Sequence, residues 1–162
     1  MFEKPRAAVK TAAIVRVGRS KDVEPLIELL RQLFALEPDF AFDPSRQRRG
    51  LRLMLSPDPG RRLWVAQVGR RVVGMCSAQI VISTAEGGPA AIVEDVIVDR
   101  TFRRRGIGQE LLAAVERWAR KRGIGRLQLL ADRWNSSALN FYSRQDWVPT
   151  RLVCLRHWVR GN

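Results

Sequence analysis

The stretch RTFRRRGIGQELL, residues 100–112, contains four arginines and then two glycines that are one residue apart. It follows a run rich in β-branched residues and leads into a pattern typical of an amphipathic helix. The first N–H groups of a helix have no partners within the helix, and together with the helix dipole they attract phosphate groups. Gly106 and Gly108 lack Cβ atoms, so an anion can approach these amides closely, and Arg103 to Arg105 add charge and fork-shaped donors. The stretch is therefore suited to bind a pyrophosphate.

Two other phosphate-binding patterns do not match this chain. No GxxxxGK[ST] sequence, the pattern of a Walker A loop, is present. A dinucleotide-binding GxGxxG pattern would need a glycine at Leu111 and an acid near residue 126 to bind a ribose, and the chain has neither. A nucleoside triphosphatase and a dinucleotide-dependent enzyme are therefore disfavoured.

The elements around this stretch follow from hydrophobic periodicity. The pattern predicts strands over 12–17, 62–69, 71–84, 91–99 and 126–131, helices over about 24–36, 45–55, 107–122 and 135–145, and one or two closing strands over 147–159. Hairpins followed by strand–helix–strand crossovers predict an α/β fold (an α+β mixed sheet) with helices packed on its faces.

Length and composition indicate one domain over 13–162, preceded by a flexible basic tail over 1–12. No run approaches the roughly 18 apolar residues of a membrane span, and the N-terminus has no apolar signal core. Cys76 and Cys154 lie in apolar, strand-like runs, so we expect two buried, reduced thiols and a cytoplasmic location.

The net charge of +13 comes mainly from arginine. A basic surface attracts polyanions, which makes a nucleic-acid-binding module the alternative function. That alternative is supported by a set of arginines before and after the second predicted helix: Arg46, Arg48, Arg49, Arg61 and Arg62. Aromatic residues are not interleaved with them, however, and arginines occur in almost every segment, so nucleic-acid binding is disfavoured.

The sequence RRRGIG resembles the [QR]xxGx[GA] motif of the GCN5-related N-acetyltransferase (GNAT) superfamily through Arg103, Gly106 and Gly108. The resemblance covers about residues 13–158, including EDVIVD before the motif and NSSALNFY after the next strand. It implies a GNAT-like fold, with a mostly antiparallel sheet that is splayed at the coenzyme site and helices on both faces. It also implies acetyl-CoA as cosubstrate, an amine acceptor and no metal.

The resemblance further implies which residues bind the coenzyme. The motif loop would hold the pyrophosphate, and the strand before it would pair with the pantetheine arm as an added strand does. The implied residues are Val96, Ile97, Val98, Arg103, Arg104, Arg105, Gly106, Ile107, Gly108, Gln109 and Asn135. For Asn135, capping of the next helix is an equal alternative.

Acetylation of an amine needs a neutral amine, an oxyanion stabiliser and an acid for the departing thiolate. Tyr142, the chain's single tyrosine, lies in NFY, where family members of this pattern place the general acid. A tyrosine with a pKa near 10 can return a proton to a thiolate whose conjugate acid has a pKa of about 8.5. Glu94 is a candidate base acting through a water, or else a solvated or ion-paired carboxylate. Asp95 is expected on the opposite face, because strand side chains alternate.

The acceptor site is implied at the first two helices and the loop between them. That loop combines acids with aromatic residues, which suits a small cationic amine or a basic peptide: Glu37, Asp39, Phe40, Phe42 and Asp43. An ordinary polar loop with two buried phenylalanines is the alternative.

One position departs from the family pattern. Asp146-Trp147 stands where Gly-Phe is common, and Asp can adopt the left-handed turn that Gly supplies. A catalytically silent relative that only senses acetyl-CoA is a further alternative, against which Tyr142 argues. A homodimer is compatible with the sequence.

Overall fold

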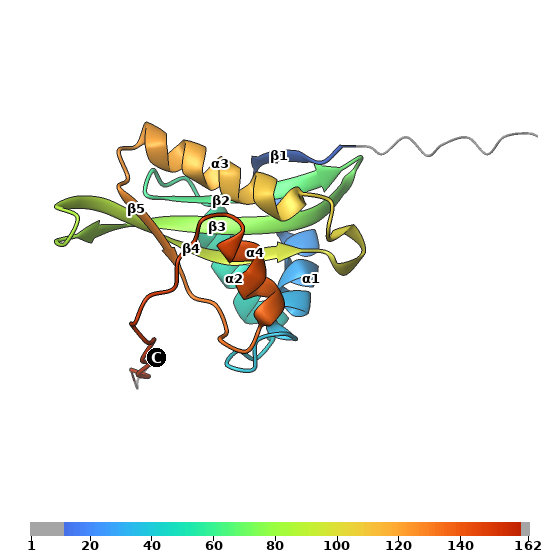
Figure 1. Cartoon of the computed structure of the whole chain (residues 1–162). Helices are drawn as coiled ribbons and strands as arrows, with labels where there is room; N and C mark the ends of the chain where they lie inside the picture. Colours follow the sequence, from blue (N-terminus) through green and yellow to red (C-terminus); the bar gives the residue numbers. More distant parts are fainter. Residues whose placement is uncertain (1–11, 160–162) are drawn as a thin grey trace, which may run out of the picture. The chain divides into compact units, whose positions relative to one another are not determined.

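The computed structural model describes residues 12–159, which form two compact units that meet in the sequence between Gln128 and Leu129 (Figure 1). The predicted tail over 1–12 lies almost entirely outside the described residues. In chain order the elements are β1 (Ile14–Val17), the 3-10 turn η1 (Ser20–Asp22), α1 (Val23–Phe34), α2 (Pro44–Leu55), β2 (Arg61–Val68), β3 (Arg71–Ser83), β4 (Gly88–Val98), the 3-10 turn η2 (Arg100–Phe102), α3 (Ile107–Lys121), β5 (Arg126–Leu129) and α4 (Ser136–Ser143).

The sheet has five strands in the order β1-β2-β3-β4-β5. The first four pair antiparallel, and a tight turn at Gly69, whose φ is 58°, joins β2 to β3. β4 and β5 are joined through α3, a crossover of the kind that places two strands parallel. The predicted mixed and mostly antiparallel sheet is therefore confirmed.

Side-chain alternation along β2 shows how the two faces of the sheet are covered. Leu63 and Val65 belong to the core that also contains the buried leucines of α1 and α2. Trp64, between them in sequence, packs edge-on against Trp118 of α3, with ring centroids 5.6 Å apart. Figure 1 shows α1 and α2 on one side of the sheet and α3 on the other. The prediction of helices on both faces is confirmed.

A β-bulge interrupts β4. Met75 of β3 is paired with Ile97 and Ser77 with Glu94, so two residues of β4 lie opposite the single Cys76. Asp95, the first of those two, has a left-handed backbone with φ of 54°. A bulge bends its strand and re-aims the side chains next to it, so simple alternation of faces does not extend through this part of β4.

β4 also extends well beyond its neighbour β5. The amide of Gly125 donates to the carbonyl of Pro89, so β5 starts beside the beginning of β4. β5 has 4 residues and β4 has 11. The second half of β4, which includes the bulge and leads to residues 99–106, therefore runs past the end of β5. This part of β4 is where the splay between the two strands is expected.

The prediction of closing strands is wrong, because residues 147–159 form no strand in the structure. Pro149 has no N–H to donate to a ladder. The apolar side chains that suggested strands are exposed instead, Leu152 by 87% and Leu155 by 89%. Cys154 is exposed as well, whereas Cys76 is buried. The prediction of two buried thiols is therefore correct only for Cys76, whose thiol pKa is raised by burial.

No helix within residues 12–159 is both long enough and apolar enough to cross a membrane.

Candidate active site

The β4–α3 loop, residues 99–106, ends at a glycine with a left-handed backbone. Gly106 is the residue before α3 and has φ of 78° and ψ of −2°. No atom lies within 4 Å of a Cβ built at this position, so the backbone angle, rather than crowding, favours glycine. Arg104 is also left-handed, with φ of 60°, while Arg105 between them is not. Such alternation turns successive N–H groups toward one concave side, where an anion binds.

The N-terminus of α3 adds donors to this concave side. The helix starts at Ile107, so the N–H groups of Ile107, Gly108 and Gln109 have no carbonyl one turn earlier to bond. The backbone bond from Glu110 to the Gly106 carbonyl, 3.1 Å long, is the first of the helix. Gly106 is exposed and Gly108 is half-buried, while the side chain of Ile107 is buried. The motif glycines thus lie at the start of a helix, as the sequence predicted, and their role in binding the coenzyme stays a prediction.

A buried carboxylate holds the start of the loop. Asp99 is only 6% exposed and accepts hydrogen bonds from the amide and the hydroxyl of Thr101, at 2.9 and 2.7 Å. Arg71 of β3 forms an ion pair with it at 3.0 Å. Burial raises the pKa of Asp99, but these bonds outweigh burial and the pKa lies below its usual value. Gln32 of α1 also donates to Asp99, at 3.4 Å, and accepts from the amide of Arg100 at 3.3 Å.

The arginines of the loop have structural contacts of their own. Arg103 donates from Nε to the last carbonyl of β4 at 3.0 Å. Arg105 donates to a carbonyl of η2 at 3.0 Å and stacks over the ring of Phe102, 4.9 Å from its centroid. Arg71 stacks over the same ring at 5.1 Å. These contacts fix the loop, and the guanidinium groups keep their positive charge while making them.

A cavity with a volume of about 240 Å³ lies between α1, α2 and the sheet. We call it the α1–α2 cavity. Its lining is mostly apolar, with a few polar groups, and consists of Leu30, Phe34, Arg46, Gln47, Gly50, Leu51, Met54, Leu63 and Asp95. Asp95 is the single acid among these residues and comes from the bulge of β4. The strand that leads into the β4–α3 loop therefore also supplies a carboxylate to this cavity.

Asp95 carries the most perturbed carboxyl group of the site. Burial raises its pKa to about 6, and the nearby charges of Glu94 and Glu37 act in the same direction. A hydrogen bond from the hydroxyl of Ser77, at 3.5 Å, opposes them. Titratable groups with shifted pKa values in a cavity are candidates for chemistry. Simple alternation along the strand did not identify Asp95, because the bulge cannot be read from the sequence.

Glu94 lies outside the α1–α2 cavity, unlike its neighbour Asp95. Its side chain is exposed, and its carboxylate accepts a hydrogen bond of 3.2 Å from the side-chain amide of Gln79 on β3. The role of Glu94 as a base through a water stays a prediction.

The predicted acceptor loop is divided between the cavity and the start of α2. Glu37 is close enough to raise the pKa of Asp95, and Phe40 stacks on the cavity residue Phe34 with centroids 5.4 Å apart. Asp43 instead caps α2, accepting from the amides of residues 45 and 46 at 2.9 and 3.1 Å. Asp39 and Phe42 lie between these positions and are exposed. Phe40 is exposed too, so the alternative of two buried phenylalanines is wrong.

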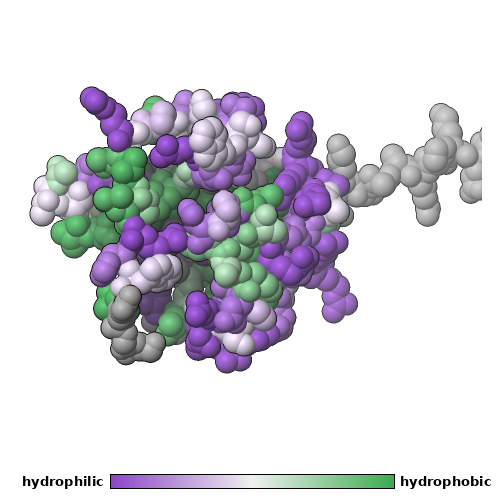
Figure 2. Space-filling view, turned by 90° about the horizontal axis from the view of Figure 1, so that it is seen from below, coloured by the Kyte–Doolittle hydropathy of each residue, from purple (hydrophilic) through white to green (hydrophobic). Residues whose placement is uncertain are grey.

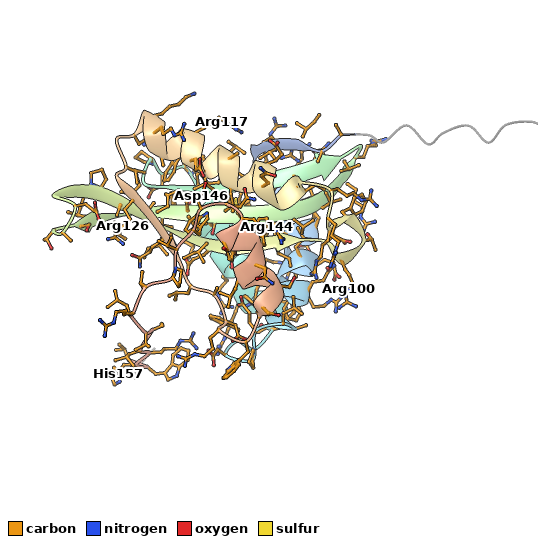
Figure 3. The ribbon with its side chains drawn as sticks, in the orientation of Figure 1. Arg100, Arg117, Arg126, Arg144, Asp146 and His157 are labelled. Carbon is orange, nitrogen blue, oxygen red and sulfur yellow. The ribbon has the colours of Figure 1, made fainter. Side chains whose placement is uncertain are left out.

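The second unit contains the predicted general acid. Tyr142 is half-buried on α4, with its ring 5.2 Å from Phe141 and 6.0 Å from Trp147. Asn135 caps this helix by accepting from the amide of Ala138 at 3.0 Å, which confirms its capping role. Asp146, labelled in Figure 3, has φ of 61°, the left-handed turn that the sequence predicted.

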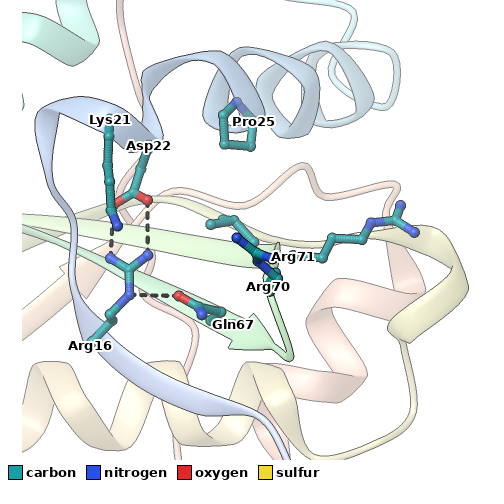
Figure 4. Close-up of a pocket in the computed structure, with 8 residues that line it drawn as sticks. Arg16, Lys21, Asp22, Pro25, Gln67, Arg70 and Arg71 are labelled. Carbon is teal, nitrogen blue, oxygen red and sulfur yellow. Dashed lines mark hydrogen bonds and ion pairs between the residues drawn. The ribbon is translucent and has the colours of Figure 1, made fainter.

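A larger and more polar cavity, of about 680 Å³, lies beside β1 and the β2–β3 turn (Figure 4). Arg16 is held there by two bonds to Asp22, at 2.8 and 2.9 Å, and by Gln67 at 2.9 Å. The guanidinium and the carboxylate stabilise each other's charge, and the hydrogen bond from Arg16 lowers the pKa of Asp22. This pair joins β1 to the start of α1 and is a structural contact.

The mixed sheet and the left-handed loop at the start of α3 are consistent with the family that the sequence resembles, and similarity to known proteins agrees. Residues 26–147 match the model of the acetyltransferase (GNAT) family, so the chain belongs to that family.

Two curated relatives and one solved structure illustrate the similarity. An L-ornithine N5-acetyltransferase of Arabidopsis thaliana is 40% identical over 67 residues, 38% of this chain and 29% of that protein. An uncharacterised N-acetyltransferase of Methanocaldococcus jannaschii is 26% identical over 153 residues, 94% of this chain and 66% of that protein. The chain thus spans less than two thirds of either relative. An aminoglycoside N-acetyltransferase solved with CoA shares the fold, with a TM-score of 0.79 and 19% identity over 96% of this chain and 99% of the other.

The carboxylate of Asp95 makes the stability of the protein depend on pH. Its pKa in the folded chain is about 6, against an ordinary value of 3.8. Between these values the folded state holds a proton that the unfolded state has lost, so the free energy of unfolding falls as pH rises from about 4 to 6. We expect Asp95→Asn to remove this loss, which is about 3 kcal/mol, because Asn is neutral and tolerates a left-handed backbone. Urea unfolding of both proteins at pH 4 and pH 7.5 measures the difference.

The same exchange at Asp146, which is also left-handed but exposed, is the matched control. Asp146→Asn should leave the pH dependence of stability as it is in the unaltered chain. Equal pH slopes for Asp95→Asn and the unaltered chain would show that the Asp95 carboxylate is ionised without cost.

Proposed function

We propose that the chain transfers the acetyl group of acetyl-CoA to a primary amine by direct attack on the thioester. The observation that carries this proposal is the β4–α3 loop, where a left-handed Gly106 and the first amides of α3 form a row of donors beside three arginines. Such a site suits the pyrophosphate of the coenzyme. The second half of β4, beyond the end of β5, offers backbone groups to an extended pantetheine arm.

In the proposed reaction the amine nitrogen bonds to the acetyl carbon while the carbon–sulfur bond breaks. Tyr142 donates its hydroxyl proton to the departing thiolate, which makes it the general acid. The attacking nitrogen loses a proton to a carboxylate, either Glu94 through a water or Asp95 in the α1–α2 cavity. Tyr142 then recovers a proton from solvent and the carboxylate releases its proton to solvent, so the chain is unchanged after each turnover.

The proposed acceptor site is the α1–α2 cavity. Asp95 of β4, the strand that precedes the β4–α3 loop, is part of its lining. The cavity thus combines a carboxylate with apolar walls. The L-ornithine acetyltransferase relative is named for an acceptor with an amino group in its side chain, which is consistent with a cationic amine here.

The distribution of charge argues against nucleic-acid binding as the main function. Many arginines form ion pairs with nearby acids, such as Arg48 with Glu24 at 2.9 Å and Arg126 with Glu86 at 2.8 Å. Figure 3 shows Arg100, Arg117 and Arg126 at separate places, on η2, α3 and β5. Hydrophilic side chains are likewise spread among apolar ones on the face shown in Figure 2.

The proposal is tested by titrating the protein with acetyl-CoA in a calorimeter and by following release of the CoA thiol with a panel of amines. We expect saturable binding of acetyl-CoA and thiol release that depends on the amine. A duplex DNA and a single-stranded RNA are titrated in parallel at two salt concentrations. Tight, steeply salt-dependent nucleic-acid binding without any affinity for acetyl-CoA would contradict the proposal.

A further inference from the structure

We propose that the α1–α2 cavity selects a small primary amine with a mostly apolar body, whose ammonium group pairs with Asp95 and whose length is limited at Gly50. This inference rests on the proposed function, because it names the class of acceptor for that reaction. The position of the carboxylate, the nature of the walls and the space at Gly50 support it.

The carboxylate is positioned by the bulge of β4. Its left-handed backbone, with φ of 54°, places Asp95 among the cavity residues from α1 and α2. The hydrogen bond that its Oδ2 accepts from the hydroxyl of Ser77 is long, at 3.5 Å. A carboxylate in an apolar surrounding is stabilised most by a cation that also donates hydrogen bonds. A primary ammonium group supplies both.

The signs of the other charges near Asp95 are compatible with a cation at this carboxylate. Glu94 on β4 and Glu37 after α1 add negative charge, since both raise the pKa of Asp95. Arg46 of α2 lines the same cavity, but its guanidinium pairs with Asp43 at 3.5 Å. Cys76, from β3, is neutral because burial raises its thiol pKa. The charges that act on Asp95 itself are therefore negative, which favours a cationic partner for this carboxylate over an anionic one.

The walls and the volume limit the size and polarity of the group that carries the ammonium. Leu30, Phe34 and Met54 are apolar and suit methylene groups or one ring. At about 30 Å³ for each water molecule in the liquid, a cavity of about 240 Å³ has the volume of roughly eight water-sized groups. A phenylethyl or hexyl chain is of this size, whereas a three-ring aminoglycoside is several times larger.

Gly50 is exposed and leaves open space where α2 borders the cavity. It lines the cavity, and a Cβ built on it has no atom within 4 Å. A side chain at this position therefore enters open space without displacing its neighbours. Leucine would add four carbons and, by the same measure, occupy about half of the cavity. Its helix propensity also exceeds that of glycine, so the exchange does not weaken α2.

The test compares two amine probes, ethylamine and phenethylamine, in the full chain and in three variants. Asp95→Asn is expected to raise the KM of both amines about tenfold, the value of one lost charge-assisted contact. Gly50→Leu is expected to raise the KM of phenethylamine about tenfold and that of ethylamine by less than about twofold. Arg49→Leu, an exposed position of the same helix outside the cavity lining, should change neither. The Kd of acetyl-CoA should be equal in all four proteins.

Two different failures are distinguishable. If acetyl transfer occurs but neither Asp95→Asn nor Gly50→Leu alters the KM of phenethylamine, the inference is wrong and the proposed function stands. If the unaltered chain neither binds acetyl-CoA nor acetylates any amine, the proposed function itself is wrong. Binding of phenethylamine to the CoA-loaded protein, measured by thermal shift, gives the same comparison without turnover. A thermal shift retained in Asp95→Asn would overturn the role of the carboxylate.

Discussion

Gly106→Val is expected to weaken the binding of acetyl-CoA by at least tenfold. A residue other than glycine loses about 1–2 kcal/mol in a left-handed backbone, and a β-branched one loses more. The loop in the variant relaxes toward negative φ, which turns the first amides of α3 away from the position where they would meet a pyrophosphate. Because about 1.4 kcal/mol corresponds to tenfold in affinity, the backbone effect alone reaches the expected size. Calorimetric titration with acetyl-CoA measures it.

Gly123 provides a matched control for this prediction. It lies just after α3, has φ of 63°, and has no atom within 4 Å of a built Cβ. Gly123→Val therefore has a similar backbone cost at the opposite end of the same helix. We expect the two variants to lose similar amounts of stability, while only Gly106→Val loses affinity for acetyl-CoA. Equal affinities in both variants would mean that the loop does not bind the coenzyme.

Tyr142→Phe is expected to lower kcat by about a hundredfold or more and to leave the Kd of acetyl-CoA unchanged. General acid catalysis by one positioned group contributes about 10²- to 10⁴-fold. The phenyl ring keeps the aromatic contacts with Phe141 and Trp147, so α4 retains its packing. Steady-state rates of thiol release, together with the titration of acetyl-CoA, separate the chemical step from binding.

The pH dependence of kcat distinguishes an acid from a packing residue. If Tyr142 donates the proton, kcat of the unaltered chain falls as pH rises toward about 10, where a tyrosine ordinarily loses its proton. That decline should be absent in Tyr142→Phe, because no ionisable hydroxyl remains. An unchanged kcat in the variant would remove Tyr142 from the mechanism, and a lower kcat with an unchanged pH profile would indicate a structural role.

Local signals in the sequence predicted much of the fold. The leucines of α1 and the apolar stripe of α3 recur at helical spacing and are buried as expected. Asn135 and Asp146 adopt the cap and the left-handed turn that their residue types favour. The β4–α3 loop was identified from Gly106 and Gly108, and of these two Gly106 has a left-handed backbone, which restricts the residue types tolerated there.

Long-range pairing, in contrast, could not be predicted from local patterns. The bulge in β4 is a property of its register with β3, so alternation alone did not place Asp95 in a cavity. The closing strands were predicted from apolar residues at 147–159, yet a strand also needs a partner edge. Asp43 looked like a ligand for a cation, whereas its bonds to the amides of α2 make it a helix cap.

If the β4–α3 loop binds the coenzyme as proposed, we expect its hydrogen-bonded guanidinium groups to affect how fast the anion arrives rather than how firmly it is held. Arg103 and Arg105 donate to carbonyls of the chain, but their charge still acts over about 10 Å at 0.1 M salt. That field guides an anionic ligand toward the loop and raises the association rate constant. The amides of α3 act only on contact, so they control the dissociation rate. Added salt should therefore slow the capture of acetyl-CoA far more than it hastens its escape.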